Sequence, residues 1–218
     1  MFLTQVTPAA AEQTLSVWDL TLRGGWILIP LAILSIISIY IFVQRLIIIE
    51  RARKDDNSFM QRIKDYIHEG EIESARHLCQ RTDTPYARLI LKGISRIGRP
   101  SQDVLVAIEN TGNMEIATLE KGLPWLATTA AGAPMIGFLG TVIGMVQAFY
   151  NLAAAGTSAN IAVLADGIYA ALVTTVAGLI VGIIALFAYN YLTARVNKVM
   201  NMLEAKTMEF MDLLNEPA

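Results

Sequence analysis

GAPMIGFLGTVIGMVQAFY, residues 132–150, is the stretch that decides the fold, and it contains no charged side chain. Steps of three or four residues along a helix return to one face, and here that face carries only small side chains and a threonine. Its members are Pro134, Gly137, Thr141, Gly144 and Ala148. Lipid gives helices no hydrophobic reason to associate, so this face and the Gly140-x-x-x-Gly144 spacing predict close packing against another backbone.

A second stretch, LADGIYAALVTTVAGLIVGIIALFAYNY at residues 164–191, repeats this pattern. A threonine in a membrane helix can bond back to its own helix, so a single one indicates only packing. Two small-residue faces that both bear threonine predict one shared polar seam between them. The small face of the second stretch consists of Gly167, Ala171, Thr175, Gly178 and Gly182, with Thr174 beside Thr175.

The distribution of charged residues indicates that these stretches lie in lipid and not in water. Residues 122–165 contain no Asp, Glu, Lys or Arg, and after Asp166 the next charged residue is Arg195. A hydrocarbon core of about 30 Å requires roughly 20 helical residues. Three segments are long enough, from Trp26 to Val43, from about Leu123 to Leu152, and from about Ile168 to Leu192. The sequence therefore predicts an all-α polytopic membrane protein with three transmembrane helices and a helical cytoplasmic domain.

Basic residues near the ends of membrane spans resist translocation and so indicate orientation. They follow the first span, precede the second and follow the third, whereas the connection between the second and third spans is uncharged. The N-terminus is therefore predicted outside and the C-terminus inside. The basic residues concerned are Arg45, Arg51, Arg53, Lys54, Lys121, Arg195 and Lys198.

The chain is expected to divide into seven segments along its length. Helix start and stop signals in the polar region predict helices at Ser58 to His68, Ile72 to Arg81 and Pro85 to Ile97, and another from Ser101 through Leu119. Leu15, Trp18 and Leu22 have the spacing of a short amphipathic helix at the membrane interface.

The seven predicted segments are an N-terminal periplasmic segment (1–24), transmembrane helix 1 (25–44), the cytoplasmic domain (45–121), transmembrane helix 2 (122–152), a periplasmic loop (153–165), transmembrane helix 3 (166–193) and a cytoplasmic C-terminal helix (194–218).

Several functional classes are disfavoured by what the sequence contains. The net charge is -2, with acids and bases alternating in the polar region, so no basic patch suited to nucleic acid stands out. Phosphate-loop and Gly-x-Ser-x-Gly signatures are absent, which argues against an enzyme. His68 and His77 are nine residues apart and are expected to be surface or packing residues. With Cys79 as the only cysteine, neither a cofactor nor a metal site is predicted.

Asp166 is the only formal charge near the third span. An intramembrane carboxylate is a functional candidate because its burial is costly. At the outer start of a helix, however, an acid also complements the helix dipole, and this second interpretation is preferred.

Together, residues 132–150 and 164–191 resemble the paired signature of the MotA, TolQ and ExbB proton-channel family. The resemblance extends to the Gly24-Gly25-Trp26 start, to Trp26-x-x-x-Pro30 and to the order of spans and loops. Three spans with an external N-terminus are most similar to ExbB and TolQ, since MotA has four. Residues 55–110 resemble the family mainly in length and helicity.

The resemblance implies a homo-oligomer, expected to be a pentamer, that surrounds two single-span helices of an ExbD-like partner in the inner membrane and works with a TonB-like protein. In that family protons pass at an aspartate of the partner helix. Thr141 and Thr175 match threonines that face the pore, and Thr174 is assigned with them to the proton pathway. Helix packing is assigned to Gly137, Gly140, Gly144, Gly178 and Gly182. ExbB often has a glutamate where this sequence has Ala170, so a proton route through that carboxylate cannot operate unchanged here.

Two alternatives remain open from the sequence. The same fold could serve a TolQ-like role in envelope maintenance in place of an ExbB-like role in energising TonB-dependent uptake. Alternatively, the small-residue faces could only pack subunits together in a non-conducting scaffold.

Overall fold

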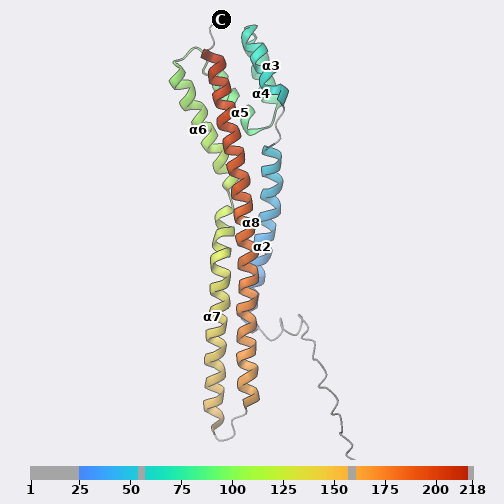
Figure 1. Ribbon diagram of the computed structural model, residues 1–218, viewed down its shortest axis with the longest axis vertical. Coiled ribbons are helices and arrows are strands. Elements are labelled where there is room, and N and C mark those ends of the chain that lie inside the picture. Colours follow the sequence, from blue (N-terminus) through green and yellow to red (C-terminus); the bar gives the residue numbers. More distant parts are fainter. Residues whose placement is uncertain (1–24, 54–56, 157–160, 216–218) are drawn as a thin grey trace, which may run out of the picture. The chain divides into compact units, whose positions relative to one another are not determined.

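The computed structural model describes residues 25–53, 57–156 and 161–215, and all regular structure in these ranges is helical (Figure 1). The amphipathic helix expected around Leu15 to Leu22 lies outside the described residues. The elements are η1 (Gly25–Ile27), α2 (Leu28–Ala52), α3 (Asn57–His68), α4 (Ile72–Arg81), α5 (Pro85–Ile94), α6 (Ser101–Glu120), α7 (Leu123–Ala155) and α8 (Ile161–Asn215).

Among the described residues, three helical segments are long and apolar enough to cross a membrane: Gly25–Ala52, Leu123–Ala155 and Ile161–Asn215. Large apolar side chains such as Ile36, Phe138 and Phe187 are exposed on them, as expected for surfaces that face lipid. The fold class predicted from the sequence, an all-α polytopic membrane protein, is confirmed.

Helix α8 differs from the sequence-based expectation of a third span followed by a separate helix, because it continues unbroken for 55 residues. No glycine or proline interrupts it after Gly182. Beyond the apolar part it keeps a buried stripe at helical spacing, consisting of Leu192, Val196, Val199, Leu203 and Phe210. The change from lipid-like to amphipathic composition therefore occurs within one helix. The segment boundaries at 193 and 194 stay a prediction about where the membrane ends.

The chain divides into two compact units, and α2, α7 and α8 contribute residues to both. The first comprises residues 1–33 and 132–181. In the described part of this unit, α7 and α8 run side by side (Figure 1). They pack through glycines, alanines and threonines, so the helix axes can approach closely.

The second unit comprises residues 34–131 and 182–218 and contains α3 to α6. The predicted helix signals are found here. Helix α3 ends before Gly70, which has a φ of 75°, and α5 begins with Pro85 in its first turn. The fully buried side chains include Phe59, Ile63, Tyr86, Ile90 and Ile108, and the Phe59 and Tyr86 rings meet edge to face, 5.0 Å apart.

Within the second unit, Gly93 is the point of closest approach between α5 and its neighbours. A Cβ atom at Gly93 would overlap the ring of Phe210 from α8 and lie 2.8 Å from Cδ1 of Ile108 from α6. Gly112 on α6 is a contrast, because a Cβ atom there would meet only Leu89, at an ordinary 3.5 Å. The core of this unit therefore requires glycine at position 93 but not at position 112.

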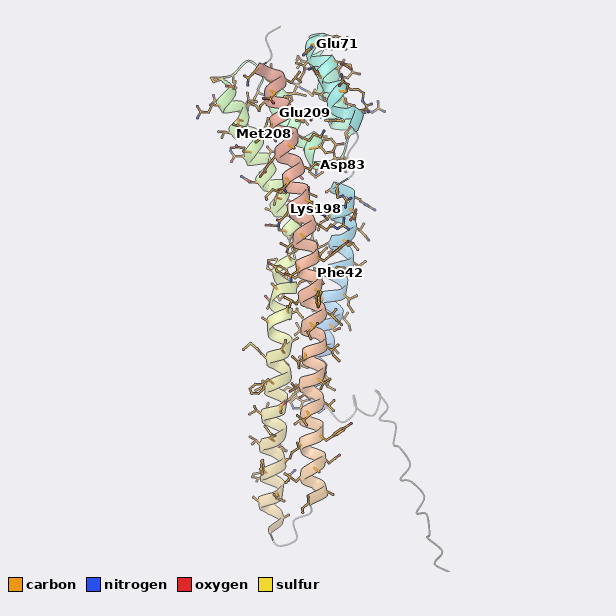
Figure 2. The ribbon with its side chains drawn as sticks, in the orientation of Figure 1. Phe42, Glu71, Asp83, Lys198, Met208 and Glu209 are labelled. Carbon is orange, nitrogen blue, oxygen red and sulfur yellow. The ribbon has the colours of Figure 1, made fainter. Side chains whose placement is uncertain are left out.

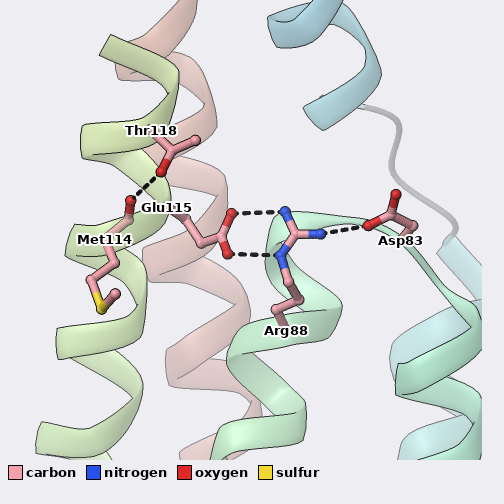
Figure 3. A network of polar contacts seen from close by, with 5 residues as sticks. All are labelled: Asp83, Arg88, Met114, Glu115 and Thr118. Carbon is pink, nitrogen blue, oxygen red and sulfur yellow. Dashed lines mark hydrogen bonds and ion pairs between the residues drawn. The ribbon is translucent and has the colours of Figure 1, made fainter. Parts of the chain in front are cut away.

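A charged cluster joins α5 to α6 (Figure 3). The Arg88 guanidinium donates from Nε and Nη2 to the two carboxylate oxygens of Glu115, each at 2.7 Å, and from Nη1 to Asp83 at 2.6 Å. The hydrogen bonds that Arg88 donates to Glu115 raise the pKa of Arg88 above its ordinary value. The Glu115 side chain is 18% exposed and that of Asp83 is 97% exposed, so the Glu115 pair is the structural one.

Helices α2 and α8 of the second unit are joined by a polar and aromatic cluster. Arg195 forms an ion pair with Glu50 at 3.0 Å, and its guanidinium lies over the ring of Tyr191, 5.0 Å from the centroid. Phe42 of α2, labelled in Figure 2, has its ring centroid 6.3 Å from that of Tyr191. Arg45 donates to the backbone oxygen of Thr118 at 3.2 Å, which links α2 to α6.

Candidate functional site

The candidate site is the glycine–threonine seam, the contact between Gly137, Thr141, Gly144 and Ala148 of α7 and Gly167, Ala171, Thr174, Thr175 and Gly178 of α8. A Cβ atom added at Gly144 would lie 2.7 Å from Cβ of Ala171, and one added at Gly167 would lie 2.7 Å from Cβ of Ala148. These separations are shorter than van der Waals contact, so each position accepts only glycine without a shift.

At the centre of the seam the helices touch through their backbones. A Cβ atom at Gly137 would lie 2.8 Å from the carbonyl oxygen of Thr174, and one at Gly178 would lie 2.5 Å from that of Ala133. Backbone atoms cannot rotate away as the end of a side chain can. The two glycines therefore set the distance between α7 and α8.

Three threonine hydroxyls gather where the glycines bring the helices together. Thr174 Oγ1 donates to the carbonyl of Ala171 at 2.7 Å and lies 3.2 Å from that of Gly137. Thr175 Oγ1 donates to the Gly137 carbonyl at 3.1 Å, crossing from α8 to α7. Thr141 Oγ1 lies 3.2 Å from the Ala171 carbonyl and forms a hydrogen bond with Thr175 Oγ1. The hydroxyls of Thr141 and Thr175 therefore meet across the seam.

The three hydroxyls differ in what else they can bind. A hydroxyl has one hydrogen to donate and two lone pairs that accept. Thr174 is 2% exposed, and backbone carbonyls occupy its hydrogen. Thr141 and Thr175 are only partly buried. If Thr175 donates to Gly137 and Thr141 donates to Thr175, the oxygen of Thr141 is free to accept a further hydrogen bond.

The remaining residues singled out in the sequence have these positions. Gly140 is buried, and a Cβ atom there would overlap the Thr174 side chain and lie 3.2 Å from Cγ2 of Ile27. Gly182 is buried and belongs to the second unit. The close approach of Ile27 to α7 has no signal in the sequence, since Gly24-Gly25-Trp26 indicates only the entry to the membrane.

Asp166 is exposed and is the sixth residue of α8. The dipole interpretation placed it at the start of the helix, but α8 begins at Ile161 and has no acidic residue in its first turn. The interaction with the helix dipole fades beyond that turn. Because the helix starts five residues before Asp166, the interpretation of Asp166 as a residue that complements the helix dipole is wrong.

No metal-ligating group is found among the described residues: no three His, Cys, Asp or Glu side chains gather as they would around an ion. Cys79 is buried, and burial raises the pKa of its thiol to about 12. The thiol is therefore protonated at neutral pH, and we treat it as a core residue.

The fold and the seam define a class: a polytopic helical membrane protein in which two spans pack through glycine and present hydroxyls in surroundings without formal charge. The model of the MotA/TolQ/ExbB proton channel family matches residues 81–205, and this chain belongs to that family. The resemblance found in the sequence is thereby confirmed.

Relatives from both named branches are similar to this chain. An ExbB homolog of biopolymer transport from Methanothermobacter thermautotrophicus is 32% identical over 187 residues, covering 84% of this chain and 65% of the relative. The Tol-Pal system protein TolQ of Haemophilus influenzae is 32% identical over 191 residues, covering 79% of this chain and 80% of the relative. The biopolymer transport protein ExbB of Neisseria meningitidis is 29% identical, covering 80% and 83%. The chain is a subunit of the ExbB/TolQ type.

Proposed function

We propose that this chain is the ExbB-like inner-membrane subunit of a motor driven by the proton motive force, which energises TonB-dependent outer-membrane transport with an ExbD-like partner. The subunit forms a homo-oligomer, a pentamer, around two single-span partner helices. Its N-terminus lies in the periplasm and its C-terminus in the cytoplasm, because the basic residues cluster at the inner ends of the spans.

One observation carries the proposal: the hydroxyls of Thr141 and Thr175 meet at the glycine-lined contact of α7 and α8. The glycines hold the helices close enough for the hydroxyls to bridge them. Neither hydroxyl ionises at physiological pH. The seam can therefore bind and release a proton carrier without itself becoming charged.

The titrating group in this mechanism is a carboxylate supplied by the partner helix. When protonated, the carboxyl group donates a hydrogen bond to the free lone pair of Thr141. When ionised, it can only accept, and the Thr141 hydroxyl must turn its hydrogen away from the Thr175 oxygen to meet it. Each protonation step thus changes which hydrogen bonds hold the partner against the wall.

The energy available suits a loosely held partner. One elementary charge crossing 100 mV is worth about 2.3 kcal/mol, comparable to one or two net hydrogen bonds. A wall of glycine, alanine and threonine offers hydrogen bonds without a fixed charge. A proton can therefore release the partner helix from one subunit and allow it to move to the next.

The proposal is tested in cells by Thr141→Ala and Thr175→Ala, with Thr128→Ala as the matched control. The Thr128 hydroxyl is exposed and bonds only to Pro124 in its own helix. We expect loss of energised uptake in the first two variants and normal uptake in the third, with equal amounts of assembled complex on native gels. Full uptake in both seam variants would overturn the proposal.

A second candidate is a TolQ-like role, favoured by the 32% identity to a Tol-Pal system protein. The two roles share the seam and differ in output. Deletion of the gene separates them: loss of TonB-dependent iron or vitamin uptake supports the ExbB-like role, and outer-membrane leakage with intact uptake supports the TolQ-like role.

A further inference from the structure

A groove of about 840 Å³ runs between α6 and α8 in the second unit, and its charge is of one sign. Three carboxylates line it, from Glu109 on α6 and from Glu204 and Asp212 on α8, and its lining includes no basic side chain. Leucine, isoleucine and methionine side chains line it as well, together with uncharged polar ones such as Gln102, Asn113 and Thr207. We call this surface the acidic groove.

On α8 the acidic groove presents a regular stripe. Met200, Glu204, Met208 and Asp212 recur every four residues and so lie on one helix face. Met208 is 68% exposed, and it lies on the part of α8 beside α6 (Figure 2). Exposed methionine provides apolar contact that adapts to the shape of a partner.

A second hollow, of about 550 Å³, lies between α5 and α6 and carries the opposite charge. Lys92 and Arg96 line it together with a single acid, Asp103. Val106 and Met114 supply apolar surface and are 48% and 72% exposed. We call this surface the basic groove.

The two grooves use opposite faces of α6. The residues of α6 that line the acidic groove include Leu105, Glu109 and Asn113, whereas those that line the basic groove include Val106, Asn110 and Met114. At 100° per residue, the mean directions of all the α6 residues that line the two grooves are about 160° apart. A molecule with complementary patches that face in different directions associates head to tail and forms a ring when the rotation closes.

The charges in these grooves are available to a second molecule. Arg88 and Arg195 are already paired within the chain, to Glu115 and Glu50. In the described part of the chain, by contrast, the side chains of Lys92, Arg96, Glu204, and Asp212 have no ion-pair partner. Opposite charges of this kind steer association and set its register.

We propose that the acidic groove of one copy of this chain packs against the basic groove of a second copy. In this contact Glu204 and Asp212 of one subunit face Lys92 and Arg96 of the next, and Met208 packs against Val106 and Met114. The contact repeats around the assembly with a fixed direction. The inference rests on the homo-oligomer of the proposed function and adds its cytoplasmic contact and polarity.

Cysteine cross-linking of the full-length chain in membranes tests the contact. One tagged chain carries Met208→Cys, a differently tagged chain carries Met114→Cys, and a short bismaleimide is added after co-expression. Native Cys79 is buried and serves as the background in unsubstituted chains. We expect products that carry both tags and no product between two Met208→Cys chains. Glu69→Cys, in the exposed turn that follows α3, is the control and should give no product with either.

Charge reversal provides the second readout. Glu204→Lys should lower the yield about fivefold, the effect of one exposed ion pair at its upper range, and Lys92→Glu in the adjoining copy should restore it. Glu69→Lys should leave the yield unchanged.

The outcomes separate this inference from the proposed function. A monomer on native gels would overturn both the homo-oligomer and this contact. An intact oligomer that gives no mixed-tag product, links Met208→Cys chains to one another, or links Met208→Cys only to another protein would overturn the contact alone.

Discussion

Replacing Gly178 by alanine tests whether the seam is held by direct backbone contact. The new Cβ atom would lie 2.5 Å from the carbonyl oxygen of Ala133 and 2.9 Å from Cα of Gly137. To restore van der Waals contact, α7 and α8 must separate by roughly 1 Å. The hydrogen bond from Thr175 to Gly137, now 3.1 Å, would then lengthen to about 4 Å and be lost.

The magnitude follows from three terms. Alanine gains about 1 kcal/mol over glycine in helix propensity. Overpacking costs about 1–3 kcal/mol, and each of the two interhelical hydrogen bonds lost, from Thr174 and from Thr175 to the Gly137 carbonyl, costs about 0.6 kcal/mol in a membrane. The expected net loss in the free energy of unfolding is therefore about 1–3 kcal/mol.

Gly132→Ala is the matched control, because Gly132 lies on α7 in the same unit and a Cβ atom there meets nothing within 4 Å. This variant should be as stable as the parent or up to about 1 kcal/mol more stable. Reversible unfolding in mixed micelles with increasing SDS, followed by helix circular dichroism, measures both. Equal stability of Gly178→Ala and Gly132→Ala would refute the reasoning that α7 and α8 meet at Gly178.

Three further predictions concern the second unit and are checked on the purified chain in detergent. Gly93→Ala should destabilise it by about 1–3 kcal/mol through overpacking, whereas Gly112→Ala should not, as thermal unfolding will show. Glu115→Gln should cost about 1 kcal/mol after allowance for solvent screening, and Asp83→Asn should leave the midpoint of denaturant unfolding unchanged. Since burial raises the pKa of Cys79 to about 12 from an ordinary 9.0, its neutral form stabilises the fold below pH 9. That stability should be lost as pH rises from 9 toward 12, at about 1.4 kcal/mol per unit, and maleimide should label the thiol at pH 8 only after unfolding.

Much of the fold is predictable from local sequence signals. Gly70 and Pro85 mark helix ends because each has a backbone preference that acts within a few residues. The faces of α7 and α8 that carry small side chains can be predicted from the helical period of three to four residues alone. Their contact was predicted as a shared seam, since two such faces without lipid-facing bulk are most stable together.

Other features depend on contacts between distant residues and carry no local signal. Arg88 and Glu115 are 27 positions apart, and nothing in either neighbourhood identifies the other. The continuation of α8 was not predicted, because Arg195 and Lys198 mark the end of the predicted third span. These basic residues indicate only where the chain leaves the membrane, and the backbone remains helical there. Helix α5 ends at Ile94, three residues before the expected Ile97, and turns occupy the positions that follow.

Proton flux in reconstituted vesicles is the most direct test of the claim that the Thr141 and Thr175 hydroxyls form part of a proton pathway. The chain is reconstituted with its single-span partner, a potassium potential is imposed, and internal pH is followed with a trapped dye. We predict flux only when the partner is present, its loss when both threonines are replaced by alanine, and its retention when both are replaced by serine. Undiminished flux in the alanine variant, with the assembly intact, would contradict the account.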